Sequence, residues 1–158
     1  MKQNKAYVIS GLVLLAAYLL QDVFSLKWMW LETVQQGETY KQITGLLLFL
    51  YIAEQWYLSV LRVRGEKDKQ RSLYQLHTVL GVLAPVFFYL HSTQFGYAYL
   101  FLLSVAYFSN LLVGLLHQKY WKIKWKRYSF YWMIAHVTLS VFVVILMGYH
   151  VFIAFYYS

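Results

Sequence analysis

The sequence predicts an all-α integral membrane protein with five transmembrane helices, and three observations lead to that fold class. First, 61% of the 158 residues are hydrophobic and only 13% are charged, too little polar surface for a soluble globular protein. Second, one proline, eight glycines and a mean hydropathy of +0.49 leave no room for flexible linkers or long disordered regions. Third, five apolar runs approach the length of about 20 residues that crosses a hydrocarbon core. We therefore expect one transmembrane domain over residues 1–158.

The first span resembles a signal peptide, because Lys2 and Lys5 precede an apolar run. No small-x-small cleavage site follows near residues 22–25, so we expect a retained helix. Charged or turn-forming segments separate the later spans: a mixed loop near 27–42, a charged loop at 62–71, a turn at 93–96 and a basic loop at 117–127. The expected spans are 6–26, 43–61, 72–92, 97–116 and 128–157, the last being long enough to tilt.

The basic residues are distributed unequally between the two sides of such a membrane protein. Of the 14 Lys and Arg residues, only Lys27 and Lys41 fall outside the N-terminus and the second and fourth loops. The positive-inside rule therefore places the N-terminus in the cytoplasm and Ser158 on the outer side. Topology accounts for nearly all of the net charge of +8, so we expect membrane lipid and no nucleic acid as a partner. The small, cysteine-free chain favours a prokaryotic inner (cytoplasmic) membrane.

The absence of cysteine excludes disulfides, thiolate iron–sulfur clusters and c-type haem attachment, so redox chemistry would have to use histidine. Four of the five histidines lie in two expected spans: His77 and His91 in the third, and His136 and His150 in the fifth. Within each pair the residues are 14 apart, which on an α-helix returns to within about 40° of one face after about 21 Å. Each helix thus offers two ligands at two depths.

The third and fifth spans both run from inside to outside. The first histidine of each lies at a similar distance along the sequence from the preceding basic loop. His77 can therefore meet His136 and His91 can meet His150 when the helices face each other. Two opposed imidazoles at each of two levels suit bis-histidine haem, whose iron takes one axial nitrogen from each side. Gly81, Ser140 and Gly148 supply small side chains near the ligands, and Arg64, Lys67 or Arg71 lie near the inner propionates; the outer level has Lys27, Lys41, Ser92 and Thr93.

Other functions of these histidines remain open, since intramembrane histidines also form interhelical hydrogen bonds or proton paths. A zinc or copper site is disfavoured, because two histidines per level leave the coordination incomplete. Glu54 is the one acid well inside a span, and it is a candidate proton carrier or the partner of an inner polar group. His117, at the end of the fourth span, is an interfacial residue or contacts a propionate or quinone. Pro85 lies midway between His77 and His91 and predicts a kink.

Five spans with His-x13-His on the third and fifth resemble the ferric reductase-like transmembrane domain of ferric reductases, NADPH oxidases and bacterial relatives. The matching stretches are LHTVLGVLAPVFFYLH and AHVTLSVFVVILMGYH, and the resemblance covers residues 72–157. It implies that the four histidines are axial ligands of two b-type haems. The flavin and nicotinamide domain of eukaryotic members is not expected, because no glycine-rich dinucleotide fingerprint occurs.

These features predict the electron-transfer subunit of a membrane oxidoreductase, a di-haem cytochrome b without catalytic side chains of its own. Its donor would be quinol or a separate redox subunit, a flavoprotein or a cytochrome, and its acceptor would lie on the opposite face. An alternative keeps the haems in a quinone-reacting anchor of a respiratory dehydrogenase or reductase, with Glu54 or His117 handling protons. A third is a haem-free transporter or assembly factor.

Overall fold

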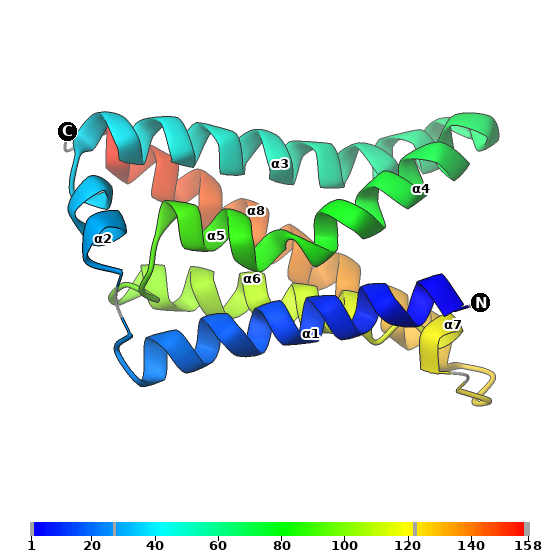
Figure 1. The fold of residues 1–158 in the computed structure, drawn as a ribbon. Helices are drawn as coiled ribbons and strands as arrows, with labels where there is room; N and C mark the ends of the chain where they lie inside the picture. Colours follow the sequence, from blue (N-terminus) through cyan, green and yellow to red (C-terminus); the bar gives the residue numbers. More distant parts are fainter. Residues whose placement is uncertain (1, 27, 122, 157–158) are drawn as a thin grey trace. The chain divides into compact units, whose positions relative to one another are not determined.

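The computed structural model describes residues 2–26, 28–121 and 123–156, and every regular element in these ranges is an α-helix (Figure 1). The chain divides into two compact units, Met1–Gln94 and Phe95–Ser158, each of which is described here by itself.

Some sequence predictions concern residues outside the described part of the chain. These are the outer-side charge of Lys27, the inner-side charge of Lys122, the end of the last span at 157 and the location of Ser158. The side chains of Lys2, Arg71 and Lys119 likewise lie outside it.

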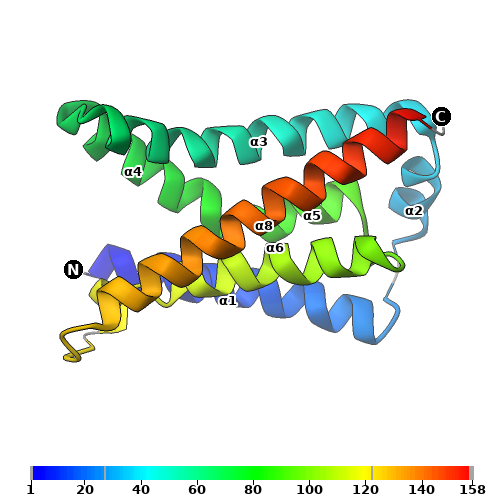
Figure 2. The same ribbon diagram turned by 180° about the vertical axis from the view of Figure 1, so that it is seen from behind.

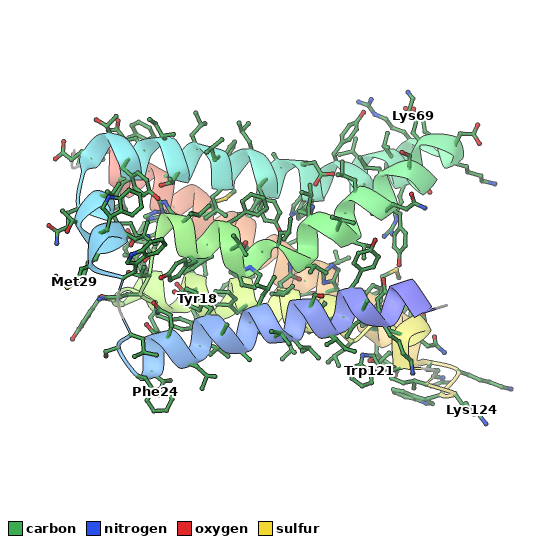
Figure 3. All side chains as sticks on the ribbon, in the orientation of Figure 1. Tyr18, Phe24, Met29, Lys69, Trp121 and Lys124 are labelled. Carbon is green, nitrogen blue, oxygen red and sulfur yellow. The ribbon has the colours of Figure 1, made fainter. Side chains whose placement is uncertain are left out.

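The first unit is built around a long helix and a bent helix that runs back beside it. α3 (Glu38–Arg64) ends at Gly65, whose left-handed backbone (φ 72°) reverses the chain. α4 (Lys67–Val82) and α5 (Ala84–His91) then return along α3, and α1 packs against both (Figure 1). Tyr18 of α1 meets the ring of Phe88 edge-on, with centroids 5.4 Å apart (Figure 3). The remaining helices of this unit are α1 (Lys2–Val23) and α2 (Met29–Gln35).

The break between α4 and α5 confirms the kink that Pro85 predicts. Proline has no N–H, and its ring opposes the carbonyl four residues earlier, so the helix stops at Leu83 and restarts with Pro85 in its first turn. The two helices are bent by 51°. A hydroxyl of α3 compensates part of the break, because Tyr51 donates to the carbonyl of Leu80 at 3.4 Å.

Side chains from other helices satisfy the backbone at the end of α5. The amide of Gln35 donates to the carbonyls of Tyr89 (2.7 Å) and Leu90 (3.2 Å), and its oxygen accepts the N–H and hydroxyl of Thr93. Gln35 and Thr93 are both buried, and the side chains of Tyr40 and Gln21 donate to Leu90 and Thr93 at 2.8 Å. These bonds hold the last turn of α5, which carries His91, against α1, α2 and α3.

The second unit is an antiparallel helix pair joined by a short helix. α6 (Tyr99–Leu115) packs along α8 (Tyr128–Tyr156), and Figure 2 shows α8 crossing α6 obliquely. α7 (Gln118–Trp121) lies in the connection. Tyr128 and Trp132 of α8 donate to the carbonyls of Leu116 (2.7 Å) and Val113 (2.6 Å), and so satisfy the end of α6.

Within the described ranges, three helices are long and apolar enough to cross a membrane: Lys5–Val23 of α1, α3 and α8. The bent pair α4–α5 makes a fourth if it is one span. α6, in the place of the expected fourth span, is apolar but has only 17 residues, against the roughly 20 that a span needs. The described part of the chain is thus all-helical and contains three candidate membrane-spanning helices.

Several helices extend beyond the ends of the expected spans. α3 and α4 extend into the expected loops because Glu, Lys, Gln and Arg are good helix formers that need no lipid. The expected loops at 27–42 and 117–127 also contain helical turns, α2 and α7.

The two glycines with positive φ differ in how close other atoms lie to the position that a Cβ would take. We expect Gly65→Ala to cost about 1–2 kcal/mol, the strain of a left-handed alanine, because no described atom lies within 4 Å of the new Cβ. At Gly96 (φ 77°) a Cβ would lie 2.7 Å from the Cβ of Leu100, so Gly96→Ala should cost more. Thermal unfolding of both variants in the same detergent measures the difference. Equal losses would contradict the steric argument.

Candidate functional site

The four membrane histidines are divided equally between the two units. His77 is on α4, His91 is the last residue of α5, and His136 and His150 are on α8. Because α8 is unbroken, the 14-residue spacing does place His136 and His150 near one face, about 21 Å apart along the axis. The 14-residue spacing does not place His77 and His91 on one face in this way, because the bend at Leu83 lies between them.

His91 packs its ring directly against a glycine of α3. A Cβ at Gly45 would lie 3.3 Å from Cε1 and 3.8 Å from Nδ1 of this ring, whereas Nε2 lies more than 4 Å away. The Cε1 corner of the ring therefore lies closest to α3. A side chain in place of Gly45 would require the imidazole to shift by a few tenths of an ångström.

His136 repeats this arrangement in the second unit. A Cβ at Gly114 of α6 would again lie 3.3 Å from Cε1 and 3.8 Å from Nδ1 of the ring, with Nε2 beyond 4 Å. Trp132, one helical turn earlier, stacks on His136 at 5.4 Å with 13° between the planes. Two histidines on different helices thus place the same ring atoms, Cε1 and Nδ1, against a glycine.

A hydroxyl lies beside Nδ1 of His91. The Oγ1 of Thr44 is 2.8 Å from the backbone carbonyl of Tyr40, to which it can donate its one hydrogen. The same oxygen lies 3.2 Å from Nδ1 of His91, and it accepts the Nδ1 hydrogen when its own hydrogen is donated to Tyr40. Nε2 then carries a lone pair, as in metal-binding histidines whose other nitrogen donates to a neighbouring group.

His150 also has a hydroxyl beside Nδ1. The phenol oxygen of Tyr99, on α6, lies 3.5 Å from this nitrogen, and the two ring centroids are 6.2 Å apart. Tyr149 packs edge-on against Tyr99 at 5.0 Å and restricts its position. Both histidines expected at the outer level are therefore held at Nδ1 by a hydroxyl from an adjacent helix.

Glu54 and His77 lie near the same residue of α3. The amide of Gln55 donates to Oε2 of Glu54 at 2.6 Å, and its backbone interacts with the His77 ring. The other carboxylate oxygen, Oε1, is buried and has no hydrogen-bond partner among the described residues. A half-buried acid with one buried, unsatisfied oxygen is a candidate for proton handling.

His117 lies outside this arrangement, between α6 and α7. Its ring meets Trp132 edge-on at 4.4 Å and lies 5.7 Å from Tyr120. Packing therefore accounts for its position.

The small residues expected beside the ligands have different environments. No described atom lies within 4 Å of a Cβ at Gly148, and the nearest to one at Gly81 is Oε1 of Gln55 at 3.9 Å. Ser140 instead accepts a hydrogen bond from Asn110 at 3.4 Å. Five residues beside the histidines were not predicted from the sequence: Thr44, Gly45, Tyr99, Gly114 and Trp132. For Gly45 and Gly114 a signal was present, because a glycine within an apolar run indicates close helix packing in membranes.

These residues fit b-type haem ligation better than a small metal ion. Among the described residues, no group of three or more His, Cys, Asp or Glu side chains could hold a metal ion, and zinc needs three or four ligands. An axial haem pair needs only two neutral imidazoles with a lone pair at one nitrogen. The Thr44 contact and the two glycine cradles suit that requirement.

Comparison with known proteins adds no relative. No family model matches the chain, and neither a curated protein nor a solved structure matches it. The resemblance to the ferric reductase-like domain stays a proposal that depends on the histidine pattern.

Replacing the acceptor of His91 tests the tautomer assignment. We expect Thr44→Val to remove the Nδ1 partner, so that the two neutral tautomers mix, whereas Thr44→Ser keeps the hydroxyl and the Nδ1–H form. Nitrogen-15 NMR of histidine-labelled protein distinguishes a protonated Nδ1 from an unprotonated one. An unchanged His91 signal in Thr44→Val would show that another group fixes the ring.

Proposed function

We propose that this protein is a membrane di-haem cytochrome b that carries electrons across the bilayer. His77 and His136 would bind the inner haem, and His91 and His150 the outer one. This pairing comes from the spacing of the histidines along the sequence. The observation that carries the proposal is the identical packing of His91 and His136, each with Cε1 of its ring closest to a glycine of a neighbouring helix.

The side chains around the histidines prepare them for this role. Thr44 keeps the proton of His91 on Nδ1, so that Nε2 is available as a ligand without losing a proton. Gly45 and Gly114 let a neighbouring helix support the ring and limit its rotation. When bound, each haem supplies an iron that changes between ferrous and ferric states and so transfers one electron.

The proposal includes five spans, with α4–α5 and α6 each crossing once, the N-terminus in the cytoplasm and the C-terminus outside. The basic connections support this orientation. The protein would reside in a prokaryotic inner membrane as the electron-transfer subunit of an oxidoreductase. It would take electrons from quinol or from a flavoprotein or cytochrome partner.

Haem content of the purified protein tests the proposal. We expect a pyridine haemochrome assay to give two b-type haems per chain for the wild type. Alanine at His77, His91, His136 or His150 removes one axial ligand, so each variant should retain about one haem, because losing a ligand weakens binding strongly.

His117→Ala is the matched control, since this histidine packs among aromatic rings and should leave both haems bound. A colourless wild type, expressed with ample haem, would overturn the cytochrome proposal and favour a haem-free transporter or assembly factor. Full haem content in all four variants would reject the ligand assignment.

The environment of Glu54 favours a second candidate, a quinone-reacting haem subunit of a respiratory dehydrogenase or reductase. Quinol oxidation releases two protons with its two electrons, and a buried carboxylate with a free oxygen can accept one of the protons. Glu54 is also near Gln55, which contacts His77, so proton acceptance and the inner ligand would lie close together.

Glu54→Gln tests this candidate without changing side-chain size. We expect haem reduction by a soluble quinol analogue to slow by about 100-fold or more, with haem content unchanged, because an amide cannot accept the proton. Glu38→Gln, at the exposed start of α3, removes the same charge and should have no effect. Equal rates in the two variants would remove Glu54 from the mechanism.

A further inference from the structure

A cavity of about 300 Å³ lies between the end of α3 and the start of α4. Its lining residues form one stripe on each helix: Leu58 and Arg62 at i and i+4 on α3, and Lys67, Gln70 and Tyr74 at i, i+3 and i+7 on α4. Its volume is at the lower end of the range for ligand pockets, about 300–1,000 Å³. The cavity lies wholly within the first unit.

The lining combines an apolar side with two cations. Leu58 is buried, whereas Arg62 and Lys67 are exposed and provide two positive charges with no acid among the lining residues. Gln70 is half-buried and Tyr74 adds a phenol. Such a site suits a compact anion attached to an apolar group.

The acid before Lys67 and one carbonyl at the end of α3 are already hydrogen-bonded. Glu66 accepts a hydrogen bond from Lys69 at 2.6 Å, and this bond lowers the pKa of the Glu66 carboxyl, so it stays ionised and paired. The carbonyl of Leu61 accepts the N–H of Glu66 and the side-chain amide of Gln70, both at 3.2 Å. The negative end of α3 is thus partly neutralised beside the cavity.

We propose that this cavity binds the phosphate group of an anionic ligand, either the headgroup of an anionic phospholipid or free phosphate. Arg62 and Lys67 bind the phosphate oxygens, as Arg and Lys commonly do. The buried Leu58 contacts the glycerol or acyl portion when the ligand is a lipid. Basic pockets at the ends of membrane helices bind anionic headgroups by this chemistry. In this proposal Lys67 binds the phosphate and not a haem propionate.

Native mass spectrometry of the full chain in detergent tests the site, with phosphatidylglycerol, phosphatidylcholine and inorganic phosphate as probes. We expect the wild type to retain phosphatidylglycerol in preference to phosphatidylcholine, and each of Arg62→Gln and Lys67→Gln to weaken retention about fivefold. Displacement of the lipid by millimolar phosphate would identify free phosphate as the ligand. Retention despite phosphate would identify the lipid headgroup. Both results support a phosphate site.

Lys69→Gln is the matched control, because Lys69 is in the same turn, outside the cavity lining and paired with Glu66 (Figure 3). It removes the same charge and should retain the lipid as the wild type does. Equal retention in all variants, or equal loss in Lys69→Gln, would overturn the proposal. So would loss of haem in Lys67→Gln with unchanged lipid retention, since the cation would then serve a propionate. Thermal unfolding of each variant checks that the fold is intact.

Discussion

The first unit depends on satisfying the backbone of a broken helix in an apolar protein. Lipid offers no hydrogen bonds, so a carbonyl released by a break or a helix end must find a partner within the protein. Gln35 provides several of these partners, bonding to two carbonyls of α5 and to both donors of Thr93. The break that Pro85 introduces is therefore compatible with a fixed position for His91, because the end of α5 is bonded to other helices.

In both units a glycine packs closely against an imidazole, but the two residues occupy different positions along their helices. In the first unit Gly45 comes near the start of the long helix and meets the last residue of α5; in the second, Gly114 comes near the end of α6 and meets a histidine early in α8. Antiparallel pairing makes both encounters possible. Because membrane helices gain little from apolar burial against each other, small residues that permit close approach contribute much of the packing.

The helical class and the kink at Pro85 could be predicted because each follows from local composition or from one residue. The helix ends could not be predicted in this way. An apolar run indicates only the part of a helix that would lie in lipid, whereas α3 and α4 continue through charged residues. The histidines are visible in the sequence, but Thr44 lies 47 residues from His91 and Tyr99 lies 51 from His150. Helices that are apolar on all sides give no periodic signal for the face that packs, so such contacts require the structure.

The hydroxyl of Thr44 also bears on proton conduction. A histidine relays protons by accepting one at one nitrogen and releasing one from the other. Release from Nδ1 of His91 would need an acceptor beyond Thr44, and the one hydrogen of that hydroxyl is already committed to the Tyr40 carbonyl. Passing a proton along this route would first require breaking a helix-internal bond. With its Nδ1 hydrogen donated to Thr44, His91 is poorly suited to a proton wire.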